Sequence, residues 1–149
     1  MPIAKKISVA GSGHLSLNAA ANTTLITAGT YYKIAGTFDV GLSRLFSAAT
    51  NKIKWNGPSG ARFLFNGSSD LAVDKLCEIT YSLYCNGLLV PGAQTPHTFV
   101  ALAKTVNISI TAIIALNHGD ELDVYAKSNA DNTLLTVRAL GITFWGESK

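Results

Sequence analysis

The residues whose side chains could perform chemistry are few and scattered along the chain. The three histidines, His14, His97 and His118, form neither an H-x-x-x-H nor an H-E-x-x-H pattern, so zinc ligation has no basis in the sequence. No serine lies in the G-x-S-x-G context that presents a nucleophile. The sequence therefore predicts no catalytic residues, no metal site and no cofactor, and the protein is interpreted as not an enzyme.

The acidic residues Asp120, Glu121 and Asp123 form the only carboxylate cluster. A calcium ion would require several carboxylate and carbonyl oxygens around one point. Alternation along an extended chain instead directs Asp120 and Glu121 to opposite faces. A pair of glycosidase carboxylates is defined by a separation that sequence alone does not give. We interpret the cluster as a solvated hairpin turn.

The two cysteines, Cys77 and Cys85, lie on the same face of one predicted strand. At ~3.3 Å per residue their separation is roughly 26 Å, far beyond the spacing that a disulfide bridges. We interpret both as small buried apolar side chains. Nothing in the sequence requires an oxidising compartment.

The composition favours an oligomer. Of the 149 residues 48% are hydrophobic and only 14% are charged, where about 25% is usual. A single domain of this length folds without disulfides or metals, but so few charges give little ionic surface for a monomer. Burial between copies is the simpler explanation, and a surface rich in Ser, Thr and Asn is the alternative.

Several partners are disfavoured by the distribution of charge and hydrophobicity. The net charge is +3, and the basic residues are scattered rather than clustered as in a nucleic-acid-binding surface. No apolar run reaches the ~18 residues of a membrane span. The stretch after Lys5 and Lys6 is interrupted by polar residues, so we predict no signal peptide.

Residues 1–25 are small and polar, and we predict an extended N-terminal arm that is ordered by contact with a partner. The domain would then span residues 26–149. The arm residues expected to make the contact are Ile3, Lys5, Lys6, Ile7, Val9, His14, Leu15 and Leu17.

The rest of the chain predicts short strands separated by turns and no amphipathic helix longer than two turns. The clearest strand, residues 75–86, directs Cys77, Ile79, Tyr81, Leu83 and Cys85 inward and ends at the tight-turn pair Asn86-Gly87. Residues 39–74 are predicted to be irregular, with Asn66-Gly67 as a break. The other predicted strands cover residues 30–38, 52–55, 61–65, 88–90, 97–104, 106–116, 122–127 and 133–145. Such a pattern is typical of an all-β antiparallel sandwich or barrel.

The last predicted strand, residues 133–145, is apolar on both faces. Leu134, Leu140, Ile142 and Phe144 share one face, and Leu135, Val137, Ala139 and Trp145 share the other. One face can fill the core while the other meets a neighbouring copy, and the sequence does not decide between them. Alternatively, loops and strand ends of the same chain cover both faces.

Four segments together resemble the C1q/tumour-necrosis-factor-like jelly roll in the form found in bacteriophage virion proteins. They are Gly29–Ile34 (GTYYKI), Tyr84–Gly87 (YCNG), Asn117–Tyr125 (NHGDELDVY) and Gly141–Trp145 (GITFW). The resemblance covers residues 26–146. It implies a ten-strand jelly roll that assembles as a homotrimer, with the terminal strand near the threefold axis. The candidate trimer contacts are Leu134, Leu140, Ile142, Phe144, Trp145 and Tyr31.

The resemblance leads to two main functional hypotheses. The first is a capsid decoration (cement) protein on the virion surface, assembled in the host cytoplasm, whose arm reaches across neighbouring subunits of the major capsid protein. The second is the receptor-binding head of a tail or head fibre that recognises a host glycan or surface protein. The sequence shows neither the G-X-Y repeats nor the heptads of a fibre stalk. An enzyme or a cellular C1q-like protein is the third alternative.

Overall fold

The computed structural model describes residues 10–40, 45–49, 52–102 and 104–147, and these form strands and turns without a helix. The strands are β1 (Ala10–Leu17), β2 (Ala21–Leu25), β3 (Tyr32–Lys33), β4 (Phe38–Val40), β5 (Phe46–Ala49), β6 (Lys52–Trp55), β7 (Ala61–Val73), β8 (Glu78–Cys85), β9 (Leu88–Thr98), β10 (Val106–Leu116), β11 (Glu121–Ser128) and β12 (Thr133–Glu147). No described segment is a helix long and apolar enough to cross a membrane.

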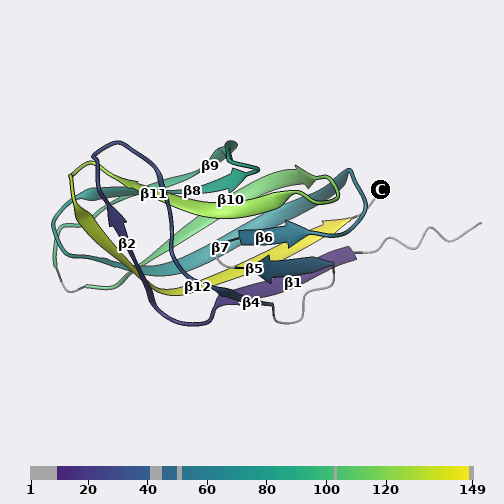
Figure 1. Cartoon of the computed structure of the whole chain (residues 1–149), viewed down its shortest axis with the longest axis horizontal. Helices are drawn as coiled ribbons and strands as arrows, with labels where there is room; N and C mark the ends of the chain where they lie inside the picture. Colours follow the sequence, from purple (N-terminus) through teal and green to yellow (C-terminus); the bar gives the residue numbers. More distant parts are fainter. Residues whose placement is uncertain (1–9, 41–44, 50–51, 103, 148–149) are drawn as a thin grey trace, which may run out of the picture.

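The strands form two antiparallel sheets that pack face to face (Figure 1). Sheet A has the order β10-β7-β12-β1-β4, with β2 also paired to β12. Sheet B has the order β5-β6-β11-β8-β9, with β3 also paired to β11. The two continuous orders together contain ten strands. The prediction of an all-β antiparallel jelly-roll sandwich is confirmed.

The core between the sheets contains an aromatic cluster near the end at which β12 finishes. The ring of Phe144 stacks on Phe46 with centroids 4.3 Å apart and meets Phe65 edge-on at 5.3 Å. Trp55 and Phe63 complete the cluster at 4.8 Å from each other. Each of these five side chains is at most 5% exposed. Aromatic pairs in such tilted and edge-to-face arrangements stabilise beyond their buried area.

Strand β7 differs from the prediction, because it continues through Asn66-Gly67 where a break was expected. Gly67 pairs with Ile110 of β10 and Ile142 of β12, in the middle of sheet A. A Cβ atom at this position would lie 3.0 Å from the ring of Phe65. The glycine therefore leaves room for a core side chain and does not turn the chain.

Strand β12 contains a β-bulge that reverses its alternation. Val137 pairs with Leu71 and Ala139 pairs with Asp70, so Arg138 is an extra residue without a partner on β7. Before the bulge the odd-numbered Leu135 and Val137 face the core, whereas beyond it the even-numbered residues do. The strand therefore has one apolar face, and the prediction of two arose from ignoring the bulge.

Deleting Arg138 is expected to leave the fold intact and to change the free energy of unfolding by no more than about 1 kcal/mol. Without the extra residue, Val137 and Ala139 become consecutive members of a regular ladder, and every other side chain keeps its face and partner. The matched control is deletion of Thr136, which moves the Arg138 side chain into the buried position of Val137. Circular dichroism and urea unfolding should show a folded first variant and an unfolded second one.

The N-terminal prediction is corrected for residues 10–25. Strand β1 pairs with β12 from Ala10↔Glu147 to Ser16↔Gly141, and β2 pairs with the other half of β12. These residues are part of sheet A and not an arm outside the domain. Small residues join a sheet readily because the ladder needs only backbone groups.

Of the predicted arm residues, His14, Leu15 and Leu17 lie in β1, and Leu17 packs against the core. Ile3, Lys5, Lys6, Ile7 and Val9 lie outside the described residues.

Candidate subunit interface

An apolar row crosses the outer face of sheet A. Trp145 of β12 pairs with Leu64 of β7, which pairs with Ile113 of β10. These three side chains, which we name the apolar row, are 64%, 44% and 73% exposed. Isolated apolar side chains are common on protein surfaces, but three in cross-strand register form a continuous patch of the kind that partners cover.

The same face becomes polar toward the middle of the sheet. The Nδ2 of Asn107 donates to Oδ1 of Asp70 at 2.8 Å and to Oγ of Ser68 at 2.9 Å. The apolar row is thus confined to the end of sheet A at which β12 finishes.

Some of the predicted trimer contacts are buried inside one chain, and others lie on its surface. Leu140, Ile142 and Phe144 are at most 2% exposed within one chain, so they have no surface with which to contact a second copy. This corrects their assignment, and the bulge at Arg138 is the reason. Leu134 is half-buried on the outer side of β12, and Trp145 is exposed in the apolar row.

Tyr31 lies on the outer face of sheet B, where its ring meets Tyr84 edge-on at 5.6 Å. Tyr84 stacks on Tyr125 at 4.1 Å, and the Lys127 ammonium lies 4.8 Å from the centre of the Tyr31 ring. The Tyr31 hydroxyl accepts a hydrogen bond from Gln94 at 2.7 Å. Through these contacts the cluster joins the residue that precedes β3 to β8, β9 and β11. It lies on the opposite sheet from the apolar row.

A groove lies beside the apolar row, between β9 and β10. The strands are held together at one end by a hydrogen bond from Oγ1 of Thr95 to the carbonyl oxygen of Ser109 (2.7 Å). Toward the other end, β9 has a bulge in its pairing with β8, where residues 90–93 lie opposite the single residue Leu83. Gly92 permits the bulge with its φ of 75°. Strand β9 therefore passes through Pro91-Gly92, where the sequence predicted a break.

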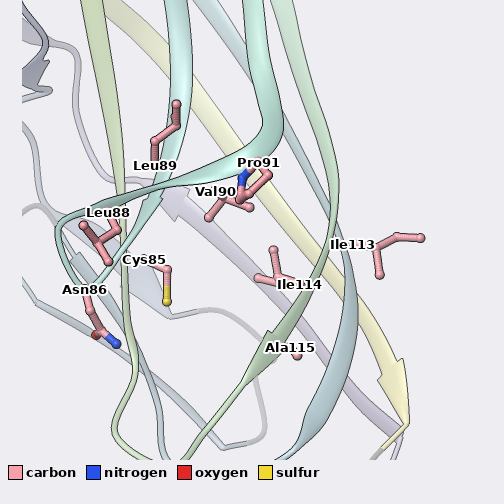
Figure 2. Close-up of a pocket in the computed structure, with 9 residues that line it drawn as sticks. All are labelled: Cys85, Asn86, Leu88, Leu89, Val90, Pro91, Ile113, Ile114 and Ala115. Carbon is pink, nitrogen blue, oxygen red and sulfur yellow. The ribbon is translucent and has the colours of Figure 1, made fainter.

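The groove has a volume of about 490 Å³. Val90 and Ile114 are buried at its floor, whereas Leu88 and Leu89 at its rim are 75% and 37% exposed. Figure 2 shows Val90 facing Ile114 across the hollow, while Leu89 points to the other side of β9 and Ile113 points away on the other side of β10. The full lining is Cys85, Asn86, Leu88, Leu89, Val90, Pro91, Ile113, Ile114 and Ala115.

The polar side chains of the groove either form hydrogen bonds within the chain already or are weak hydrogen-bonding groups. Asn86 donates from Nδ2 to Oδ1 of Asp120 at 2.8 Å and accepts from the backbone N–H of Glu121 at 2.9 Å. Cys85 is a half-buried free thiol, and burial, followed by the nearby carboxylates Asp120 and Asp123, raises its pKa. The site is suited to an apolar side chain and not to a charged or polyhydroxy ligand.

The carboxylates of Asp120, Glu121 and Asp123 all form hydrogen bonds or ion pairs within the chain. Oδ2 of Asp120 accepts from the backbone N–H of Asn117 at 2.8 Å and so closes the β10–β11 turn. Glu121 forms an ion pair with Lys52 at 3.0 Å, and Asp123 forms one with Lys33 at 2.9 Å. In the part of the chain that the structure describes, no three His, Cys, Asp or Glu side chains are grouped to hold a metal ion.

The three histidines have different structural environments. His97 packs edge-on against Phe99 at 5.0 Å. Nδ1 of His118 lies 3.0 Å from the carbonyl oxygen of Gly57 in a loop contact. The backbone of His14 pairs with that of Thr143 in sheet A.

Sequence reasoning missed Leu64 and Ile113. Both were open to detection, because each is an apolar residue on the polar face of an alternating strand: Leu64 lies between the core residues Phe63 and Phe65, and Ile113 directly precedes the core residue Ile114. The groove had no signal in the sequence, since it depends on how two strands diverge.

Comparison with known proteins identifies the fold. No protein-family model matches the sequence, and no curated protein sequence is significantly similar. Among solved structures, Eiger TNF from S. frugiperda superimposes with a TM-score of 0.62 at 10% identity, covering 94% of this chain and 95% of that one. Murine APRIL at pH 5.0 gives a TM-score of 0.55 at 13% identity, covering 87% of this chain and 98% of that one.

The chain has a TNF-like jelly-roll fold. The globular domain of zebrafish complement 1qA is a weaker match, with a TM-score of 0.47 at 13% identity, and the fold assignment rests on the first two structures. At these identities the likeness concerns the fold alone.

Proposed function

We propose that this protein is a non-catalytic structural component of a bacteriophage virion, a homotrimeric capsid decoration protein that binds and stabilises the major capsid shell. The observation that supports the assembly is the apolar row, which leaves Leu64, Ile113 and Trp145 exposed together on one face. The virion role rests on the four sequence segments that resemble phage jelly-roll proteins. The protein would act on the capsid surface after assembly in the host cytoplasm.

Stabilisation of a capsid by such a protein requires two separate surfaces. The apolar row would be buried among the three copies, because hot spots of stable interfaces are large apolar and aromatic side chains at the centre of the contact. A different segment must then contact the capsid. Since residues 10–25 belong to sheet A, we propose residues 1–9 as the capsid-binding segment, with Ile3, Lys5, Lys6, Ile7 and Val9 as the contact residues.

Replacing Leu64 with arginine is expected to convert the trimer into monomers. A charged side chain in the middle of the apolar row would be desolvated in the trimer, and loss of a central hot spot is worth about 2–4 kcal/mol, which weakens association by at least about 30-fold. Analytical ultracentrifugation measures the result. The control Leu76→Arg places the same change on a 59% exposed leucine in the β7–β8 loop, at the other end of β7, and should leave the trimer intact.

The capsid role is tested with the trimer and capsids that lack tails. The full chain should sediment with the capsids, and a chain without residues 1–9 should stay trimeric and lose this association. Deletion of residues 1–25 is unsuitable because it removes β1 and β2. Capsid binding that survives the shorter deletion would refute the role of the segment.

The fibre-head hypothesis makes a different prediction, since a receptor-binding head should bind host cells and compete with phage adsorption. Immunogold labelling of the virion separates the two, with label on the head for decoration and on a fibre tip for receptor binding.

A further inference from the structure

The groove between β9 and β10 is an incompletely covered part of the core. Its floor is made of side chains that are at most 8% exposed, Val90 and Ile114, and its rim carries the exposed Leu88. Figure 2 shows the hollow opening between the two strands with Cys85 inside it. Apolar surface of this kind is stabilised when an apolar group displaces water from it.

The same chain presents an apolar side chain of a matching kind at the same end of the sandwich. Trp145 is 64% exposed on the outer face of sheet A, and its row ends at Ile113, which also borders the groove. The projecting indole and the groove therefore form one continuous apolar surface around the edge strand β10. Burying an aromatic side chain of this size removes roughly 150–250 Å² from water.

The indole projects from β12, whereas the groove lies between β9 and β10, so each copy can donate one and receive the other. Contacts of this type link copies head to tail and close into a ring when the rotation between neighbours allows it. In a ring of three, every Trp145 and every groove is satisfied. The low charge of the chain, 14% of residues, agrees with burial of this whole end between copies.

We propose that in the trimer the indole of Trp145 of each copy fills the β9–β10 groove of the next copy. This inference rests on the proposed function, because it requires the trimer. It makes each groove complete only with a residue from a neighbour, and it makes Leu88, Leu89 and Pro91 the contacts that select an aromatic side chain.

The native thiol of Cys85 reports on the groove. In a Cys77→Ala protein, Cys85 should react slowly with a thiol reagent while the protein is trimeric. It should react at least about tenfold faster after dilution to monomers, a factor equivalent to 1.4 kcal/mol of protection. Trp145→Ala should accelerate the reaction at concentrations where sedimentation still shows trimers. Leu64→Ala, which shortens the same row outside the groove, should not. Equal rates in trimer and monomer would overturn the inference.

A disulfide gives a direct measurement. In a Trp145→Cys/Cys77→Ala protein, mild oxidation should join position 145 of one copy to Cys85 of the next and give covalent dimers and trimers on a non-reducing gel. A further Cys85→Ser change should abolish these bands. Trimers in ultracentrifugation without the bands and without Cys85 protection would refute the placement of Trp145 and leave the trimer standing. A wild-type chain that sediments as a monomer would instead refute the proposed function.

Discussion

Replacing Phe144 with alanine is expected to lower the free energy of unfolding by about 3–5 kcal/mol, the usual loss for a buried phenylalanine. Its ring is fully buried, stacks on Phe46 and meets Phe63 and Phe65 edge-on. The cavity left by the ring lies among other large side chains that cannot all relax into it. Since domains are stable by only 5–15 kcal/mol, this single change should make the protein marginal. Urea unfolding followed by tryptophan fluorescence measures it.

The adjacent residue provides the control. Trp145→Ala removes a larger ring, but one that is 64% exposed on the other side of the strand. In a Leu64→Arg background, which keeps both proteins monomeric, it should change the free energy of unfolding by no more than about 0.5 kcal/mol. If Trp145→Ala were the more damaging of the two, the phase of β12 beyond Arg138 would be opposite to the one described.

The comparison of Phe144 with Trp145 also shows what sequence patterns could predict. In strand β8 the predicted inward residues Ile79, Tyr81 and Leu83 are all fully buried, but Ser82, which was predicted to face outward, is fully buried as well, and Cys85, which was predicted to face inward, is only half-buried. Its predicted tight turn is confirmed, since Asn86 and Gly87 both have positive φ angles. At these inward positions and at the turn, local propensity and tertiary packing agree, so the sequence alone was sufficient to predict them.

The prediction was wrong where one extra residue changed the face of the sheet on which every later residue of the strand lies. The extra Arg138 reverses the faces of β12, and no local pattern distinguishes a bulged residue from a paired one. Gly67 and Gly92 show the same difficulty, because a glycine that makes room for a ring or allows a bulge resembles one that ends a strand. These differences depend on contacts between strands that are distant in sequence.

The candidate interface was only partly accessible to the sequence for the same reason. Trp145 was selected because the resemblance implies that the terminal strand lies near a threefold axis, and Leu64 and Ile113 could have been added as residues out of phase with their strands. Their alignment into one row depends on the register of three strands, β12, β7 and β10. Cross-strand register is a tertiary property, so the row appears only in the folded chain.

Stability should decrease above about pH 10 because of one buried tyrosine. Tyr81 is fully buried, and this burial raises the pKa of its hydroxyl well above the ordinary value of 10.0, although a hydrogen bond from Ser69 Oγ (2.9 Å) acts in the opposite direction. The folded chain therefore keeps the Tyr81 proton at a pH at which the unfolded chain loses it. The unfolded state is favoured progressively as the pH rises, by about 1.4 kcal/mol per pH unit, and below that range Tyr81 contributes no pH dependence.

Urea unfolding at a series of pH values tests this effect. The wild type should lose stability steadily between about pH 10 and pH 12, and Tyr81→Phe, which has no ionisable hydroxyl, should lose markedly less. Any remaining slope includes the half-exposed Tyr84, whose pKa is also raised by burial and then by Tyr31 and Tyr125. Ser69→Ala removes the hydrogen bond but keeps the burial, so its slope should match the wild type. Equal slopes for Tyr81→Phe and the wild type would mean that the Tyr81 hydroxyl ionises in the folded protein as readily as in the unfolded chain, which would contradict the prediction.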